Sequence, residues 1–358
     1  MRPALRQAWL RLHRWAGLSL GLVLAAIALT GAFLVVGKPV DRLLHPELFT
    51  APAVAAAPAS LDAVRDSLVA AYGPQASFTL RPPRQPDDTF WAFVHVPNGF
   101  DGLAYLDPAT ARVLGQRGDH EGLVNLAFEL HSSLLMGDAG RPLLAALAAT
   151  YLFLLATGVV LWWPVSWSRA FAMQWHNGLT RSLFDVHRLG GVVIGLFIAA
   201  SVGSGVWMAW KPLAGWVTSM TGDRPVTPPR VATHAGPQAS LDVMARAALA
   251  REPGATIGYI GLQPGARPVR FRLKAVDDPH PNGLTSVWFH PGTGQVLQVN
   301  RWNRLDAGAR NTAWVYPLHT GDLGGPLHKA ANALFGITLF TLGATGALLW
   351  WRRRRRLR

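Results

Sequence analysis

Four long stretches of the chain contain no charged residue and are almost entirely apolar. They are equal in length and cover residues 15–36, 142–163, 189–210 and 330–351. About 20 apolar residues cross the hydrocarbon core of a bilayer as a helix. The alternative, four core helices of a soluble protein, is disfavoured because four such equal runs are hard to bury in a chain of 358 residues. The pattern therefore predicts four membrane-spanning helices. The first stretch exceeds the roughly 7–15 apolar residues of a signal peptide, so we expect it to be an uncleaved anchor.

The two long segments between these stretches show a different pattern. In each, a serine precedes an amphipathic helical run and glycine follows it, as helix caps do: Ser60 and Gly73, then Ser240 and Gly254. Strand-like runs come next, at residues 76–81, 90–96 and 103–106, then at 256–262, 269–274 and 285–289. Each segment is therefore expected to be a small α+β module of one helix and an antiparallel hairpin.

The two halves of the chain also resemble each other. LHRWAG at 12–17 matches VHRLGG at 186–191, and at the same offset Thr-Gly at 30–31 matches Ser-Gly at 204–205. A second shared offset matches Leu-His at 130–131 to 318–319, and Thr-Gly at 157–158 to 345–346. We interpret this as an internal duplication whose halves are related by a parallel pseudo-twofold along the membrane normal.

Basic residues predict the orientation of the chain. Residues 1–14, 164–188 and 352–358 together hold 13 Lys or Arg and one acidic residue, whereas 37–141 holds 8 basic and 12 acidic residues. By the positive-inside rule both termini are cytoplasmic, and in a two-membrane bacterium the long segments are periplasmic. This topology accounts for the net charge of +14, so nucleic-acid binding is not expected.

The expected fold is an integral-membrane four-span α-helical bundle with two periplasmic α+β modules. Its predicted parts are an N-terminal tail and first span (1–36), the first periplasmic module (37–141), the second span (142–163), a cytoplasmic loop (164–188), the third span (189–210), the second periplasmic module (211–329), the fourth span (330–351) and a cytoplasmic arginine tail (352–358).

Four of the 12 histidines occupy matched positions. His13 and His187 each lie two residues before an outward-going span, and His131 and His319 lie equally far before the two inward-going spans. A polar group at membrane depth is costly and usually functional, and two histidines facing across a bundle can supply both axial ligands of a b-type haem. The absence of cysteine excludes Cys-ligated clusters and covalent haem attachment. The alternative is that these histidines bond to headgroups or neighbouring helices. His328, two residues before the last span, is a reserve ligand for the outer haem.

Other residues fit this interpretation. Arg14 and Arg188 follow the cytoplasmic histidines and are candidates to pair with haem propionates, although they serve equally well as topology charges. Small residues would leave room for a flat macrocycle, and the glycines next to these histidines are Gly17, Gly21, Gly190, Gly191 and Gly195.

Taken together, LHRWAG, LHSSLLMG, DVHRLGG, LHTGDLGG and the Thr-Gly pairs followed by Trp-Trp resemble the PepSY-associated transmembrane family over nearly the whole chain. The resemblance implies a bacterial inner-membrane protein whose outer modules are PepSY-like. It further implies iron regulation and, in dihaem ferrisiderophore reductases of the FoxB type, electron transfer through b-type haems to an iron–siderophore complex outside. PepSY domains elsewhere accompany peptidases as propeptide-like inhibitors.

The function expected from these observations is a dihaem oxidoreductase that delivers electrons to a periplasmic ferric siderophore or other ferric chelate. Two alternatives remain: a non-enzymatic PepSY module that binds or restrains a peptidase, and an accessory protein of iron transport. The electron donor, a protein, a quinol or a small reductant, is not specified. Candidate substrate-surface residues are Trp91, Phe93, Trp288, Trp302, Trp314, Tyr316, Arg301, Arg304 and Arg310.

Overall fold

The computed structural model describes residues 2–52, 57–231, 236–265 and 267–355. The predicted tail residues Arg356 and Arg358 therefore lie outside the described residues. The chain divides into two compact units. The first unit comprises Met1–Val36, Ala127–Lys211 and Leu318–Arg358, and the second comprises Gly37–Leu126 and Pro212–Pro317.

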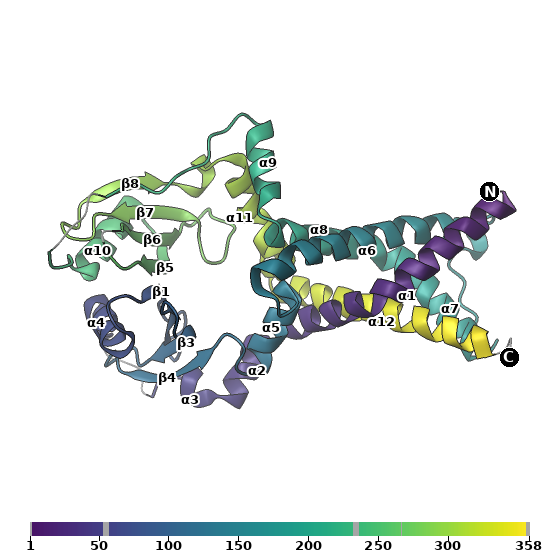
Figure 1. Cartoon of the computed structure of the whole chain (residues 1–358), viewed down its shortest axis with the longest axis horizontal. Helices are drawn as coiled ribbons and strands as arrows, with labels where there is room; N and C mark the ends of the chain where they lie inside the picture. The colour runs from purple at the N-terminus through teal and green to yellow at the C-terminus, as the bar shows by residue number, and fades with distance from the viewer. Residues whose placement is uncertain (1, 53–56, 232–235, 266, 356–358) are drawn as a thin grey trace. The chain divides into compact units, whose positions relative to one another are not determined.

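The first unit is helical (Figure 1). Its elements are α1 (Pro3–Leu34), η1 (Gly137–Ala139), α6 (Gly140–Trp162), η2 (Trp167–Arg169), α7 (Leu179–Leu189), the π-helical segment η3 (Gly190–Ile194), α8 (Gly195–Ala209), η5 (Asp322–Gly324) and α12 (Gly325–Arg355). In the described part of the chain, four helical segments are long and apolar enough to cross a membrane: Pro3–Leu34, Gly137–Trp162, Leu179–Ala209 and Asp322–Arg355. The predicted membrane helices are thus confirmed.

Each of the four helical segments begins before its uncharged stretch, and the last also runs past the end of its stretch. α1 begins at Pro3, because proline at the first helical position is preorganised and its missing N–H is not needed there. The third span begins at Leu179 and passes through the π-helical segment directly after His187 and Arg188. His13 and His187 therefore lie inside helices rather than before them.

Small residues bring two of these helices close together. A Cβ atom on Gly336 of α12 would lie 2.6 Å from the carbonyl oxygen of Ala28 on α1, and one on Gly343 would lie 2.9 Å from that of Gly21. Close backbone approach of this kind maximises van der Waals contact between helices in a membrane, where apolar lipid offers no hydrophobic driving force. The close contact between α1 and α12 therefore stabilises the helical unit.

The second unit is built around one antiparallel sheet. Its helices are α2 (Gly37–Leu44), α3 (Pro46–Phe49), α4 (Leu61–Tyr72), α9 (Pro212–Met220), α10 (Leu241–Arg251) and η4 (Trp302–Arg304). Its strands are β1 (Ser77–Arg81), β2 (Phe90–His95), β3 (Asp101–Leu106), β4 (Val113–Gly118), β5 (Thr256–Leu262), β6 (Val269–Lys274), β7 (Thr285–Phe289) and β8 (Val296–Asn300). Two further helices, α5 (Leu123–Ser133) and α11 (Ala307–Thr320), contain residues of both units.

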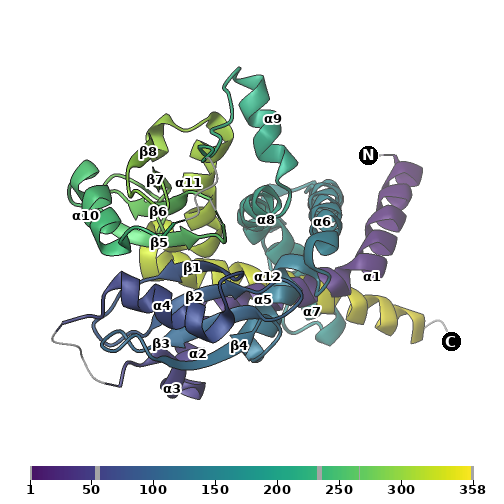
Figure 2. The ribbon, with the colours of Figure 1, turned by 60° about the vertical axis from the view of Figure 1, so that its left-hand side comes forward.

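The two predicted modules share a single sheet of order β4-β3-β2-β1-β5-β6-β7-β8 (Figure 2). They join where β1 pairs with β5, with Leu80 opposite Ile260. One face of the sheet is covered by α4 and α10, and a continuous apolar core containing Leu68, Leu80 and Phe271 lies between. Each module has one strand more than the three predicted strand-like runs: β4 in the first module and β8 in the second.

The two covering helices cap each other. Ser60 and Ser240 accept hydrogen bonds from the amides of Ala63 and Val243, which confirms both predicted N-caps. In addition, Asp242 accepts from the amide of Leu61, and Asp62 accepts from that of Leu241. A carboxylate at a helix N-terminus satisfies free amides and complements the helix dipole. α4 ends at Gly73 as expected, but α10 ends earlier, at Arg251, with Glu252 as its C-cap.

A buried ion pair fixes α2 to the edge strand β4. Both Nη atoms of Arg117 donate to the Asp41 carboxylate, at 2.9 and 2.6 Å, and Nη2 also donates to the hydroxyl of Tyr105 at 3.0 Å. Hydrogen bonding to Asp41 raises the pKa of the Arg117 guanidinium above its usual value. This bidentate geometry is the strong form of an arginine–carboxylate pair.

Asp41→Ala should destabilise the second unit by about 3–5 kcal/mol, because it leaves the Arg117 charge buried without its partner. Equilibrium urea unfolding of the purified protein, followed by tryptophan fluorescence, measures the loss. Asp66→Ala is the matched control, since Asp66 is exposed and pairs with Arg65 at the surface; it should change stability by less than about 1 kcal/mol. Equal losses in the two variants would contradict the argument.

Candidate functional site

The four matched histidines form two facing pairs in the helical unit. The ring centres of His13 (α1) and His187 (α7) are 6.2 Å apart, with ring planes at 89°. Those of His131 (α5) and His319 (α11) are 6.0 Å apart, with ring planes at 33°. Each pair therefore combines one helix from each half of the chain.

These spacings suit one metal ion between the rings of each pair. A histidine nitrogen binds a first-row metal at about 2 Å, and the centre of an imidazole ring lies about 1.1 Å from its nitrogens, given ring bonds of about 1.33 Å. Two histidines on opposite sides of one metal ion therefore have ring centres about 6 Å apart. In the described part of the chain, no group of three or more His, Cys, Asp or Glu side chains is placed to hold a metal. A metal between the rings would need its other ligands from a macrocycle.

The rings of His13 and His187 present matching nitrogens. His13 Nδ1 lies 2.7 Å from the hydroxyl oxygen of Thr157, and His187 Nδ1 lies 3.0 Å from that of Thr345. Each threonine hydroxyl donates its own proton to a helix carbonyl, of Leu154 and Thr341 respectively. Each hydroxyl oxygen therefore accepts a hydrogen bond from Nδ1–H, which leaves the lone pair of the neutral imidazole on Nε2.

The rings of His131 and His319 have the same tautomer, fixed by hydrogen bonds to backbone carbonyl groups. His131 Nδ1 donates to the carbonyl oxygen of Ile27 at 2.8 Å, and His319 Nδ1 donates to that of Ser201 at 3.0 Å. Because a carbonyl oxygen only accepts, Nδ1 carries the proton in both rings. All four histidines thus offer Nε2 for coordination and hold their orientation through Nδ1, the arrangement typical of metal-ligating histidine.

A glycine lies against every one of these rings. A Cβ atom on Gly31 would lie 2.5 Å from His131 Cε1, and one on Gly205 would lie 3.0 Å from His319 Cε1. A Cβ atom on Gly158 would lie 3.5 Å from His13 Cε1, and one on Gly346 would lie 3.4 Å from His187 Cε1, which is ordinary van der Waals contact. The four Thr-Gly or Ser-Gly pairs used above to align the repeat therefore place a glycine beside each ring. Sequence reasoning had missed this role, as well as the acceptor role of Thr157 and Thr345.

The other predicted site residues are placed differently. His319, not His328, faces His131. Arg188 is engaged within the protein: it pairs with the buried Asp185 at 3.1 Å and donates to the carbonyl oxygens of Ala170 and Ala172. Arg14 is exposed and lies over the ring of Trp15.

The glycines predicted to make room next to the histidines contact helices instead. A Cβ on Gly195 would lie 2.6 Å from Leu155 Cδ1, one on Gly17 would lie 3.9 Å from Leu154, and Gly190 and Gly191 approach α12 at Leu342. Nothing lies within 4 Å of a Cβ on Gly21. The room beside the rings of His131 and His319 comes instead from Gly31 and Gly205.

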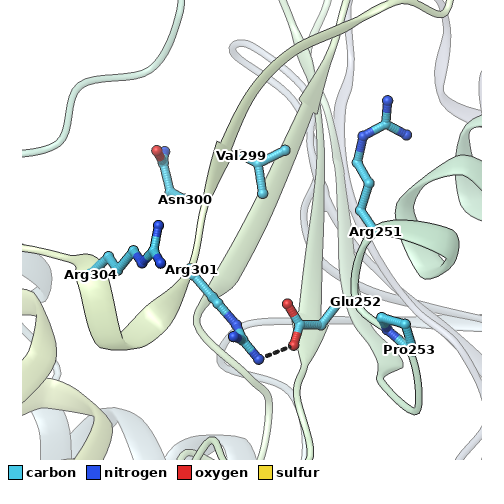
Figure 3. Close-up of a pocket in the computed structure, with 7 residues that line it drawn as sticks. All are labelled: Arg251, Glu252, Pro253, Val299, Asn300, Arg301 and Arg304. Carbon is cyan, nitrogen blue, oxygen red and sulfur yellow. Dashed lines mark hydrogen bonds and ion pairs between the residues drawn. The ribbon is translucent and has the colours of Figure 1, made fainter.

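The predicted substrate surface divides among several places in the second unit. Trp91, Phe93 and Trp288 share the face of the sheet opposite α4 and α10, because each alternates with core residues along its strand. Arg301 and Arg304 instead line an open depression with Arg251, where Arg301 pairs with Glu252 at 2.6 Å (Figure 3).

The remaining residues of the predicted substrate surface also lie in different places. Arg310 pairs with Asp223 at 3.4 Å, and Tyr316 stacks on His280 with ring centres 4.4 Å apart. Trp302 follows β8 in η4, and Trp314 is exposed on α11. These nine residues do not form one surface.

Four long apolar helices and an α+β sheet unit define the class of protein, a multi-pass membrane protein with α+β modules. The family described as the PepSY-associated TM region matches residues 10–353, and the chain belongs to this family. A comparison with curated proteins finds no match.

Proposed function

We propose that this protein binds two b-type haems and passes electrons across the bacterial inner membrane to a ferric chelate in the periplasm. The observation that carries the proposal is the fourfold arrangement of histidine, Nδ1 acceptor and glycine. In both pairs the ring spacing suits bis-histidine coordination, and the lone pairs of the two Nε2 atoms are unused. When bound, the two haems would supply one-electron carriers near the two membrane surfaces.

The protein's own residues hold and orient these ligands. The Nδ1 hydrogen bonds fix the tautomer and raise the basicity of Nε2. Gly31 and Gly205 let the rings of His131 and His319 approach the neighbouring helices closely. Because a histidine must be neutral to bind a metal, the fixed tautomer presents each ring in the form that coordinates.

The internal duplication is part of this proposal. The acceptors of His131 and His319, Ile27 and Ser201, are related by the same sequence offset as His13 and His187. Thr157 and Thr345 are related by the same offset as His131 and His319. A parallel pseudo-twofold relates both sites to one axis, with both termini in the cytoplasm by the positive-inside rule.

Reduction of the chelate is the proposed outcome outside. Hard oxygen ligands hold Fe(III) more tightly than the softer Fe(II), so one electron per iron favours release. The reductant on the cytoplasmic side belongs to one of three classes: a protein, a quinol or a small molecule.

The colour of the purified protein tests the proposal. Protein expressed with adequate haem supply should show a Soret band that shifts and sharpens on addition of dithionite, and a pyridine haemochrome assay should detect b-type haem. A colourless protein that cannot be reconstituted with haemin would overturn the proposal and leave the peptidase-binding or iron-transport alternatives.

Gly31→Val should weaken the outer site alone. The added Cβ would lie 2.5 Å from His131 Cε1, which is too close, and would displace the ring from its partner His319. We expect loss of the outer haem, measured by haemochrome content and redox titration. Gly203→Val is the matched control in α8, since nothing lies within 4 Å of a Cβ there. Similar losses in both variants would contradict the role of Gly31.

A further inference from the structure

Arginine and aromatic side chains alternate along one face of the eight-stranded sheet, opposite α4 and α10. The strand register sets the alternation. Trp91 of β2 lies opposite Arg81 of β1, Tyr259 of β5 opposite Arg272 of β6, and Arg270 of β6 opposite Trp288 of β7. We call these six residues the arginine face.

Each arginine of this face lies over its aromatic neighbour. The guanidinium carbon is 4.3 Å from the ring centre of Trp91 for Arg81, and 5.7 Å from that of Tyr259 for Arg272. For Arg270 the distance to Trp288 is 5.1 Å. The ring contacts the flat side of the guanidinium, so the N–H groups on its edge that are not already bonded within the protein can donate to an acceptor.

None of the three arginines forms an ion pair with a carboxylate of the described residues. Arg270 donates only to the neutral hydroxyl of Ser286, at 2.9 and 3.0 Å. Arg272 donates to the carbonyl oxygen of Gly283 and approaches His280 Nε2 at 3.4 Å. Arg81 is only 8% exposed. Removing a charge from water without a counter-ion is costly, and a ligand that supplies the counter-charge would offset this cost.

The nearest acidic groups are already occupied. Asp88 pairs with Arg42 at 2.9 Å and with Lys38 at 3.5 Å. Asp278 accepts hydrogen bonds from the amides of His280 and Leu284, at 2.9 and 2.6 Å. The positive charge of the face is therefore not neutralised by direct pairing within the unit, in contrast to that of Arg117.

Burial, together with repulsion from neighbouring arginines at Arg81 and Arg270, destabilises the charged form of these three side chains and so lowers their pKa values. Burial, with a smaller effect from Arg272, lowers the pKa of Arg270 to about 10. Burial also lowers the pKa values of Arg81 and Arg272. Arg270 therefore stays protonated at neutral pH, and a bound anion would stabilise its charged form. The indole Nε1 of Trp288 is buried and has no acceptor in the described part of the chain.

We propose that the arginine face binds a small polycarboxylate anion. Arginine forks match carboxylates bidentately. Arg81 and Arg272 lie on strands separated by β5, about 10 Å apart, and Arg270 lies two residues from Arg272, about 7 Å along β6. This spread suits several carboxylates on one small molecule better than a single compact anion. Resting on the proposed function, this assigns the substrate as an anionic polycarboxylate chelate of Fe(III).

Gallium(III) citrate is the probe, because Ga(III) resembles Fe(III) in charge and ligand preference but is not reduced. Full-length protein in nanodiscs should bind it saturably, with quenching of tryptophan fluorescence and a heat signal in calorimetry. Arg270→Gln, Arg272→Gln and Arg81→Gln should each weaken binding about tenfold or more, since each removes charge-assisted hydrogen bonds. Arg267→Gln removes the same charge from the exposed β5–β6 loop and should leave binding unchanged.

Two further measurements separate binding from structure. Arg270→Lys keeps the charge but loses the fork, so its affinity should lie between those of wild type and Arg270→Gln. Without ligand, Arg270→Gln should leave the melting temperature nearly unchanged, because Arg270 is half-buried and has no carboxylate partner to lose, and glutamine can still donate to Ser286. A lower melting temperature with unchanged affinity would show a purely structural role and overturn the inference.

Other outcomes also overturn it. These are no saturable binding by the wild type, an equal loss in Arg267→Gln, or equal affinity for inorganic phosphate or for a neutral gallium trihydroxamate. Failure here is distinguishable from failure of the proposed function. Gallium citrate binding to a protein without haem would contradict the dihaem proposal alone, whereas a haem-loaded reductase that does not bind gallium citrate would contradict this inference alone.

Discussion

His319→Ala should leave the purified protein with about half of its haem, because one remaining histidine holds the iron of the outer site weakly. The ring of His319 faces His131 at 6.0 Å, and its Nδ1 is fixed by Ser201. Haem content by pyridine haemochrome, together with the reduced α-band, measures the loss. His131→Ala should behave identically, and His13→Ala and His187→Ala should each remove the other half.

His328→Ala is the matched control for this experiment. His328 lies in the same region of the chain, at the start of α12, but it does not face His131. We expect full haem content in this variant. Retention of haem in His319→Ala together with its loss in His328→Ala would instead make His328 the outer ligand and break the repeat symmetry there.

The histidine pairs could be predicted from the sequence because the repeat identifies a partner for each histidine, which a single histidine position cannot do. A shared offset places each member of a pair at the same depth on its own helix, so two matched helices bring the rings together. The roles of Thr157, Thr345 and the adjacent glycines could not be predicted. They depend on how each helix is rotated about its axis, and the repeated spacing of Thr-Gly to a Trp-Trp pair does not specify which neighbour the hydroxyl meets.

The strands were predictable where side chains alternate, as in Val269–Lys274, whose inward residues are buried and outward residues are not. β4 (Val113–Gly118) carries Gly115, Gln116 and Arg117 and lacks this signal, because its position at the edge of the sheet leaves it partly covered. The joining of the modules through β1 and β5 was also not predictable. Strand pairing between modules depends on long-range contacts, which local patterns do not encode.

Reductant enclosed in proteoliposomes should reduce a ferric chelate outside them, and loss of either histidine pair should abolish this transfer. His13 of the inner pair and Ile27, which holds a ring of the outer pair, both lie on α1. At about 1.5 Å of rise per residue, their positions are offset by about 21 Å along the helix. The edges of two haems bound at these pairs would lie closer together than their irons. Electrons would then pass through both pairs in turn, so loss of either pair would interrupt the transfer.

The experiment uses dithionite trapped inside and Fe(III) citrate with a ferrous-specific chromophore outside, in vesicles whose protein orientation is checked by protease protection. We expect the rate in His13→Ala/His187→Ala and in His131→Ala/His319→Ala to fall to that of protein-free vesicles. His45→Ala serves as the control, since His45 lies in the second unit outside both pairs and should leave the rate unchanged. Transfer that persists without His13 and His187 would mean that electrons enter the outer site directly, and the inner pair would then need another role.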